Sequence, residues 1–232
     1  MKLAVMQPYF FPYAGYFCLL AAVDRFVFYD DVHYIKSGWI NRNRLLLGGE
    51  PSYFTVPVVN ASCSTRISDV AIVANGKWRR KMLESLRHGY SAAPHFGAVY
   101  ELVQSVVFAK ADSISELAKA SVYAVAKYLE VDTHFVDSSS SYDNASLRGV
   151  ERVLDICRRE QATHYINLSG GRSLYEPECF RAAGLTLAFV DSKATPYPQF
   201  SVTFQPALSI VDLLMHNAPS QARSHIGAEK GQ

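Results

Sequence analysis

Short apolar runs separated by amphipathic stretches follow one another along most of the chain. Residues 2–6 and 25–29 are apolar, β-forming runs that end at polar residues, and residues 17–23 between them are apolar with helical spacing. The second half repeats this alternation and predicts strands and helices in turn at residues 133–136, 147–161, 163–167, 176–183 and 185–190. Strands that alternate with helices are typical of a parallel sheet with crossover helices. The pattern therefore predicts an α/β fold with a mostly parallel sheet.

Further elements are predicted between the two halves and after them. They are strands at residues 53–59 and 67–73 and helices at residues 77–88, 96–109, 113–128 and 208–214. Residues 31–50 show little periodicity, and no strand or helix is predicted there. We expect a single α/β domain over residues 1–218, followed by a flexible, Gly-rich tail over residues 219–232.

Composition limits the class of protein. The chain has 232 residues, of which 49% are hydrophobic and 19% charged, and its formal net charge of +2 gives no reason to expect nucleic acid as a partner. No apolar run approaches the roughly 20 residues of a membrane helix, and the first one is too short for a signal peptide. The four cysteines are far apart, which argues against a metal site or a disulfide framework and favours a reducing compartment. We therefore expect a cytoplasmic protein without membrane insertion, and a homo-oligomer is compatible with these features.

Three polar loops are expected to meet at one edge of the predicted sheet. They follow the first, the second and a later predicted strand, and they contain Gln7, Asp30 and Asn167. Ligands of open parallel sheets bind beyond the carboxyl ends of the strands. We therefore expect these three residues to lie together at that edge and to mark a small-molecule site.

Residues 7–16 form an unusually aromatic stretch, Gln-Pro-Tyr-Phe-Phe-Pro-Tyr-Ala-Gly-Tyr. Its two prolines fix the backbone, which suits a preformed pocket. Tyrosine offers an apolar face and one hydroxyl to a sugar or a base. We therefore predict substrate-binding roles for Gln7, Tyr9, Tyr13 and Tyr16. The alternative is that these rings cap the core beneath the sheet edge.

Residues 29–44 carry the richest set of reactive side chains. Asp30 and Asp31 end a strand, and one carboxylate can orient arginines while the other faces a substrate hydroxyl or amine. His33 has the best claim among the seven histidines to acid–base work. Arginine binds phosphate or carboxylate bidentately, so the predicted substrate-binding residues include an anion clamp at Arg42 and Arg44, together with Lys36, Trp39, Asn41 and Asn43. The alternative is a solvated surface loop with internal ion pairs.

A glycine turn follows the predicted strand at residues 163–167. Asn167 and the run Gly170-Gly171-Arg172 resemble a phosphate-cradling turn, in which backbone N–H groups approach an anion. Alone this is a weak signal, because the chain has neither the P-loop nor the dinucleotide-binding pattern. It also lacks G-x-S-x-G and H-E-x-x-H, so neither a serine nucleophile nor a metal site is predicted.

These motifs together resemble the WbqC-like protein family. The resemblance rests on M-Q-P-Y-F-F-P-Y-A-G-Y-F at 6–17, F-V-F-Y-D-D-V-H-Y-I-K-S-G-W-I-N-R-N-R at 26–44, Y-I-N-L-S-G-G-R-S-L-Y at 165–175 and L-S-I-V-D-L-L at 208–214. Members are generally encoded with bacterial surface-polysaccharide genes, such as those for the O-antigen of lipopolysaccharide, so the resemblance implies work on a sugar or a nucleotide-sugar. Members usually carry Gln where this chain has His33, so the resemblance does not imply a histidine base shared by the family.

A second similarity concerns residues 11–16, which open a helix after the first strand. Nucleotidylyltransferases and pantothenate synthetases carry H-x-G-H at this place, and the corresponding residues here are Tyr13 and Tyr16. The similarity implies a related nucleotide-binding sheet of the HUP-like Rossmannoid kind. Because the adenylylating histidines are absent, ATP is a less expected co-substrate than a coenzyme A thioester.

Two functions follow as hypotheses. The first is a transferase that forms an amide on a nucleotide-linked amino sugar by acyl or aminoacyl transfer, with a coenzyme A thioester, a carrier-bound acid or an ATP-activated acid as donor. Phosphates would be held by Arg42, Arg44 and residues 170–172, and the rings of Tyr9, Tyr13 and Trp39 would stack on base or sugar. Asp30 or Asp31 would accept the proton of the amine. The second hypothesis is a non-catalytic protein that binds a nucleotide-sugar or scaffolds a polysaccharide assembly complex.

Overall fold

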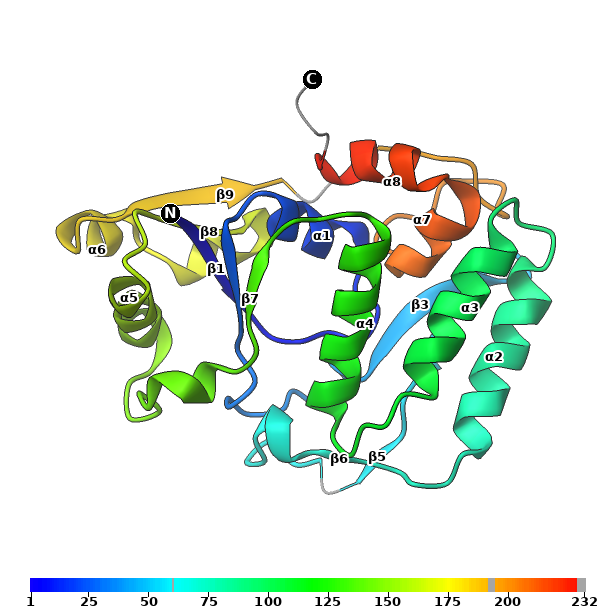
Figure 1. The fold of residues 1–232 in the computed structure, drawn as a ribbon, viewed down its shortest axis with the longest axis horizontal. Coiled ribbons are helices and arrows are strands. Elements are labelled where there is room, and N and C mark those ends of the chain that lie inside the picture. Colours follow the sequence, from blue (N-terminus) through cyan, green and yellow to red (C-terminus); the bar gives the residue numbers. More distant parts are fainter. Residues whose placement is uncertain (60, 192–194, 229–232) are drawn as a thin grey trace.

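A five-stranded parallel sheet forms the centre of the protein, as a computed structural model shows (Figure 1). Its strands lie in the spatial order β7 (His134–Val136), β2 (Arg25–Phe28), β1 (Lys2–Met6), β8 (His164–Leu168) and β9 (Thr186–Val190). The structure describes residues 1–59, 61–191 and 195–228. All five strands were predicted from apolar runs, and the prediction of a mostly parallel α/β sheet is confirmed.

The order of the strands gives the sheet a switch point. The chain starts at β1 in the middle, moves outward through β2 to β7, and then returns to the other side of β1 for β8 and β9. This is a Rossmann-like arrangement, and the strand order reverses between β1 and β8. Because all strands are parallel, their carboxyl ends meet at one edge of the sheet, and those of β1, β2 and β7 point toward the bottom of Figure 1.

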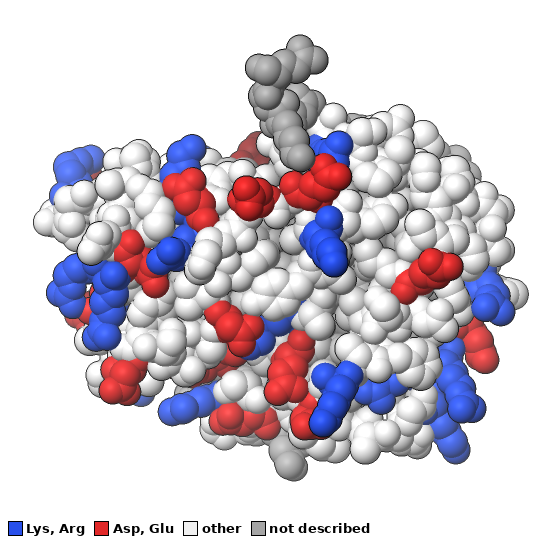
Figure 2. Space-filling model, in the orientation of Figure 1, with Lys and Arg blue, Asp and Glu red and all other residues white. Residues whose placement is uncertain are grey.

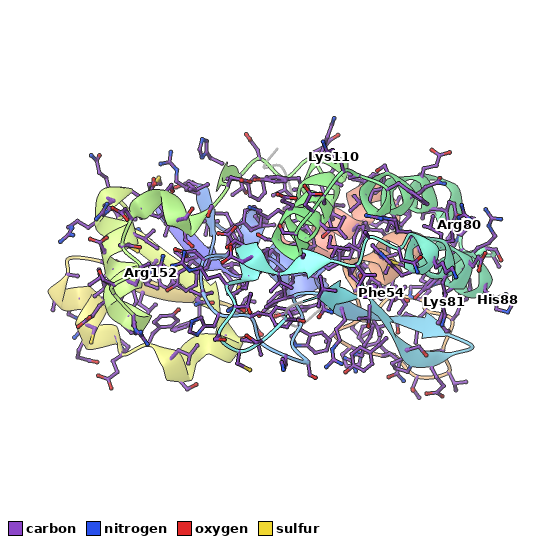
Figure 3. All side chains as sticks on the ribbon, turned by 90° about the horizontal axis from the view of Figure 1, so that it is seen from below. Phe54, Arg80, Lys81, His88, Lys110 and Arg152 are labelled. Atoms are coloured by element: carbon purple, nitrogen blue, oxygen red, sulfur yellow. The ribbon has the colours of Figure 1, made fainter. Side chains whose placement is uncertain are left out.

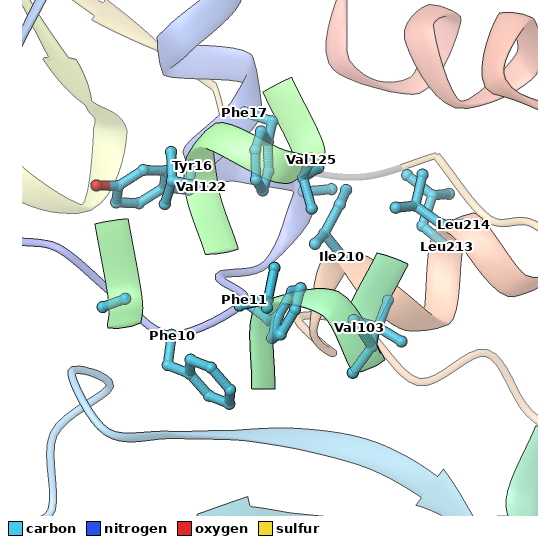
Figure 4. Close-up of a cluster of buried hydrophobic side chains, with 14 of the residues drawn as sticks. Phe10, Phe11, Tyr16, Phe17, Val103, Val122, Val125, Ile210, Leu213 and Leu214 are labelled. Carbon is cyan, nitrogen blue, oxygen red and sulfur yellow. The ribbon is translucent and has the colours of Figure 1, made fainter. Parts of the chain in front are cut away.

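The two faces of the sheet bury two separate cores, because successive side chains of a strand point to opposite faces. Leu3, Val5 and Val27 belong to a smaller core with residues of α5 (Gly149–Arg159) and α6 (Pro177–Ala182). Ala4 and Phe26 belong to the larger core on the other face. Figure 4 shows that α1 (Ala14–Ala21), α4 (Ile114–Tyr128) and α7 (Ile210–His216) contribute to this larger core.

Between β2 and β7 the chain adds a second layer of elements. Helices α2 (Lys77–Tyr90), α3 (Phe96–Val107) and α4 lie side by side, and β5 (Val58–Val59) pairs with β6 (Ala71–Ile72). A hairpin of β3 (Arg42–Leu47) and β4 (Glu50–Thr55) lies next to α2. The prediction that residues 31–50 contain no strand is therefore wrong, because β3 lies within them. Gly48 and Gly49, at φ +64° and +84°, make the tight turn that lets β3 pair with β4.

The C-terminal residues also differ from expectation. Residues 219–226, predicted as the start of a flexible tail, form helix α8 (Pro219–Ile226). Pro219 suits a first helical position, and Gln221 caps the helix by accepting a hydrogen bond from the backbone N–H of Ala218 at 3.0 Å. Ala222 and Ile226 are buried in the larger core, so packing holds the segment in place. The last four residues of the predicted tail, 229–232, lie outside the described residues.

Among the described residues, no helix combines the length and the apolar character needed to cross a membrane. The four thiols, at Cys18, Cys63, Cys157 and Cys179, are all free. Burial raises the pKa of the Cys157 thiol to about 12, so this side chain behaves as an apolar core residue.

Gly89 lies where α2 touches β3. A methyl group on Gly89 would meet the backbone oxygen of Leu46 at 2.9 Å and the side chain of Leu47 at 2.8 Å. Because a backbone oxygen cannot turn aside, we expect Gly89→Ala to lower the free energy of unfolding by about 1–3 kcal/mol. The matched control is Gly97→Ala on α3, where a methyl group would meet nothing within 4 Å. Urea unfolding measures both variants, and equal stabilities would contradict the close approach.

Candidate functional site

A pocket of about 610 Å³ lies at the carboxyl edge of the sheet. Its walls come from the loop after β2, from the first turns of α5, and from the end of the 3-10 turn after β8 (Ser169–Leu174), where Leu174 and the next residue, Tyr175, line it. Elements on both sides of the switch point therefore build one cavity, in the place where open parallel sheets bind ligands. A larger hollow of about 810 Å³ lies on another side of α5, and none of the predicted site residues lines it.

A buried ion pair forms one wall of the pocket. The Asp31 carboxylate accepts a hydrogen bond from Arg152 Nη2 at 2.5 Å and another from the Ser139 hydroxyl. Arg152 also donates from Nε to Asn144 at 2.8 Å, and its guanidinium lies 4.9 Å from the ring centre of Tyr29. Both charged side chains are almost fully buried. The pair therefore fixes β2 to α5 and gives the pocket a rigid wall.

Two further arginines line the pocket without a carboxylate partner. Arg66 and Arg148 are exposed, and neither forms an ion pair with another described residue. Arg148 is also the N-cap residue of α5, and its side chain does not cap the helix. The first residues of α5, Gly149 and Val150, also line this cavity. Two arginines and an uncapped helix N-terminus together favour a negatively charged ligand group.

The groups of the pocket that can move protons are His33 and two tyrosines. His33 is exposed at the rim, and its imidazole has no hydrogen bond to another described residue. Burial raises the pKa of Tyr29, an effect that Arg152 partly opposes, and burial also raises the pKa of Tyr175. Both phenols are therefore protonated near neutral pH and act as hydrogen-bond donors. His33 is the group in the pocket best placed to accept a proton.

Comparison with known proteins shows the family to which this chain belongs. The family model of the WbqC-like protein family matches residues 7–224. The chain belongs to this family. It is also 30% identical over 218 residues to the uncharacterized protein Rv1507c of Mycobacterium tuberculosis, an alignment that covers 93% of each chain. No solved structure matches, so the relation of the sheet to HUP-like enzymes stays a prediction. Family membership implies a role associated with polysaccharide biosynthesis.

In this WbqC-like protein the paired carboxylates point in different directions. Asp31 faces the pocket, whereas Asp30 is 2% exposed and accepts hydrogen bonds from Ser115, Lys119 and Ser138 at 2.9, 3.1 and 2.6 Å. Neighbouring residues of an extended chain point to opposite sides, which explains the split. Asp30 is therefore enclosed by protein groups, and of the two carboxylates predicted as the base only Asp31 lines the pocket.

The three residues expected at the carboxyl edge are there, but they do not form one cluster of side chains. Gln7 directly follows β1, and Asp30 is the second residue after β2. Asn167 is the last residue but one of β8. The Asn167 amide donates to the Tyr165 hydroxyl at 3.2 Å and accepts from the backbone N–H of Leu168 at 2.7 Å. The side-chain amide of Asn167 therefore makes its hydrogen bonds within the protein.

The aromatic stretch at residues 7–16 belongs mainly to the larger core of the WbqC-like protein (Figure 4). Tyr16 is fully buried and donates its hydroxyl to the backbone oxygen of Gln7 at 3.0 Å, which is the core position given above as the alternative to a contact with substrate. Burial raises the pKa of Tyr16 well above its usual range. Tyr9 is half-buried against the Tyr16 ring. Tyr13 lines a cavity of only about 20 Å³ that Tyr197 and other residues of the segment before α7 enclose.

The predicted anion clamp lies outside the pocket. Asn41 and Asn43 are buried and donate to the backbone oxygens of Val56 and Phe11 at 2.8 and 2.9 Å, so they anchor the hairpin and do not bind substrate. Arg42 and Arg44 alternate with them and lie on the outer face of the hairpin. In Figure 3, the hairpin that carries Phe54 and the helix that carries Arg152 lie on opposite sides of the molecule.

Most of the remaining predicted residues are exposed, namely Lys36, Trp39, Gly170 and Arg172, whereas Gly171 is partly buried. Lys36 lies in the loop before β3, and Gly170, Gly171 and Arg172 lie in the 3-10 turn after β8. Only the end of this turn lines the pocket, and the Arg172 guanidinium lies 4.6 Å from the ring centre of Phe189. Residues 170–172 therefore lie near the pocket but do not line it.

Sequence reasoning missed the arginines that charge the pocket, at positions 66, 148 and 152. A signal for the last of them was present. Arg152 and Asp155 fall at helical spacing on the same side of α5 as Val153 and Ile156, which are apolar and buried. Charged residues within an apolar stripe are seldom buried without a partner. Here Arg152 donates to Asp31, and Asp155 accepts a hydrogen bond from Asn144.

Proposed function

We propose that this protein binds a nucleotide-linked amino sugar in the pocket beside α5 and forms an amide on its amino group by acyl or aminoacyl transfer. One observation carries the proposal. The pocket combines two arginines that no carboxylate neutralises with an exposed histidine that has no hydrogen-bond partner among the described residues. An anionic ligand and a proton transfer are the two tasks that this combination serves.

In the proposed complex the phosphates lie against Arg66, Arg148 and the first turn of α5. The phenols of Tyr29 and Tyr175 donate hydrogen bonds to sugar hydroxyls, because burial keeps both protonated. Asp31 is a positioning residue: both of its oxygens already accept hydrogen bonds, and it holds Arg152 in the pocket wall. The amino group of the sugar then lies toward the rim, next to His33.

The proposed reaction needs a single base, which takes the proton of the amine and delivers it to the leaving group. The amine nitrogen attacks the acyl carbon, the new C–N bond forms, and the bond from that carbon to the leaving group breaks. The nitrogen loses a proton to His33, which passes it to the departing group. A coenzyme A thioester or another preformed acyl donor fits this scheme. An ATP-activated acid has less support, because Tyr13 and Tyr16 stand where adenylylating enzymes carry histidines.

Membership in the WbqC-like family supports a place for this reaction in the biosynthesis of a bacterial surface polysaccharide. The free thiols are compatible with a reducing compartment, which supports a cytoplasmic location. The test of the activity is a screen of nucleotide-linked amino sugars against acyl donors, with the amide product detected by mass spectrometry. Binding without any amide product would make the protein a nucleotide-sugar-binding or scaffolding protein.

Arg148→Ala is expected to weaken binding of a uridine-diphosphate amino sugar by about tenfold or more, since a charge-assisted hydrogen bond contributes about 1.5–3 kcal/mol. Isothermal titration calorimetry measures the affinity. Arg80→Ala on α2, an exposed arginine that does not line the pocket, is the control, and its affinity should equal that of the wild type. A loss in Arg42→Ala with none in Arg148→Ala or Arg66→Ala would move the phosphates to the hairpin and contradict the proposal.

A further inference from the structure

The outer face of the β3–β4 hairpin carries two exposed aromatic rings beside two arginines. Trp39 and Tyr53 are 39% and 54% exposed, although large aromatic side chains usually lie in the core. Their ring centres are 6.3 Å apart, with an angle of 30° between the planes. The Arg42 guanidinium lies 4.5 Å from the Tyr53 ring, and that of Arg44 lies 5.7 Å from the Trp39 ring. We call these four side chains the hairpin platform.

The arginines of the hairpin platform are held in place without losing their charge. Arg42 donates to the backbone oxygens of Gly38, at 3.2 Å, and of Ser37. Arg44 donates to the backbone oxygen of Ala207 at 3.3 Å. Carbonyl oxygens are neutral, and neither arginine forms an ion pair with another described residue. Two fixed positive charges therefore lie next to two exposed rings.

The backbone beneath the hairpin platform is rigid. Arg44 and Tyr53 are direct partners across the two strands. On the inner face, Asn41 and Asn43 tie β3 to buried backbone oxygens, and Phe54 packs into the larger core. A preformed surface loses little side-chain entropy when it binds a ligand. Each exposed cation–π contact contributes only about 0.5–1 kcal/mol, so these two contacts alone would not hold the platform rigid. The hydrogen bonds and the core packing of the inner face do so.

We propose that the hairpin platform binds an anionic saccharide, meaning sugar rings that carry carboxylate or phosphate groups. The C–H faces of a sugar ring stack on the exposed aromatic surface, and the guanidinium groups take the anionic substituents bidentately. The rings already contact each other, so no planar base fits between them. Nucleic acid needs a broad basic surface, whereas the formal net charge of the chain is only +2. Figure 2 draws the face opposite the hairpin, where basic and acidic side chains are interspersed.

This second site is separate from the pocket beside α5 and goes beyond the proposed function. It would let the protein hold an acidic glycan while a nucleotide-linked sugar occupies the pocket. The hairpin and α5 lie on opposite sides of the molecule in Figure 3, so each site can be disabled without touching the other.

Tryptophan fluorescence tests the proposal directly, because the chain has only two tryptophans. In a Trp78→Phe variant, Trp39 is the sole reporter. We expect saturable quenching by an oligogalacturonate, and binding at least tenfold weaker for neutral maltohexaose and for polyphosphate. Arg42→Ala and Tyr53→Ala should weaken oligogalacturonate binding tenfold or more, and the exposed Arg80→Ala on α2 should not. If Trp78→Phe does not fold, the signal of the wild type is compared with that of Trp39→Phe.

Several outcomes would overturn the proposal. Equal binding of polyphosphate would make the surface a general anion site, and equal binding of a single-stranded oligonucleotide would make it a nucleic-acid site. No response to the oligogalacturonate in the folded protein would also reject it. Arg148→Ala should leave oligogalacturonate binding unchanged, so a failure here is distinguishable from a failure of the nucleotide-sugar proposal.

Discussion

His33→Gln is expected to lower the turnover of the amide-forming reaction on the order of a hundredfold or more while affinity for the nucleotide-sugar stays within a few-fold. Glutamine keeps a hydrogen-bonding side chain of similar reach but cannot accept a proton in this pH range. His33 is exposed, so the substitution should leave the fold intact. Steady-state kinetics with a nucleotide-linked amino sugar and a preformed acyl donor measure both constants.

The matched control for this prediction is His88→Gln, an exposed histidine on α2 that does not line the pocket. Its kinetics should equal those of the wild type. Glutamine is also the residue that the family resemblance leads one to expect at position 33. Full turnover of His33→Gln, with a loss only in His33→Ala, would therefore mean that the side chain donates or accepts a hydrogen bond and that the base lies elsewhere.

Asp30→Ala is expected to lower the free energy of unfolding by about 3–5 kcal/mol, since it leaves a buried ammonium group without its carboxylate. Lys119 Nζ lies 3.1 Å from the Asp30 carboxylate, and both side chains are nearly fully buried. The same carboxylate also accepts hydrogen bonds from the hydroxyls of Ser115 and Ser138. Asp30 is therefore the buried partner that the two buried groups, Lys119 and Ser115, share.

Asp137→Ala provides the control, because Asp137 contacts the same ammonium group at 3.4 Å from a side chain that is 74% exposed. An exposed partner of this kind contributes about 1 kcal/mol or less. Urea unfolding followed by circular dichroism compares the two variants. Equal losses would show that water reaches Lys119 and that Asp30 is not the centre of a buried network.

The adjacent aspartates illustrate what could not be predicted from neighbouring residues. From the sequence, Asp30 and Asp31 are two equivalent candidates for a base. Their roles differ because Asp30 meets Lys119 from α4 while Asp31 meets Arg152 from α5. These partners are about ninety and more than a hundred residues away in the chain. Only the folding of both helices onto the sheet decides which carboxylate faces the pocket.

The same limit applies to the run Asn41-Arg42-Asn43-Arg44. Its residue types suggested an anion clamp. Because no strand was predicted there, the sequence did not reveal that asparagines and arginines alternate between two faces of a strand. Once β3 pairs with β4, the period of two sends the asparagines inward and the arginines outward. The Gly48-Gly49 pair was the available signal for this hairpin, since two glycines suit a tight turn between strands.

The sequence by itself determined the five sheet strands, the parallel α/β class and the WbqC-like family, because apolar runs and helical spacing are local properties that survive in the fold. It also placed Gln7, Asp30 and Asn167 at the carboxyl edge of the sheet. Tertiary structure alone decided that Tyr16 belongs to the core, that residues 219–226 fold back as a helix, and that Arg66 and Arg148 charge the pocket. Burial and ion pairing depend on which distant segments meet, and that is set by the packing of the whole chain.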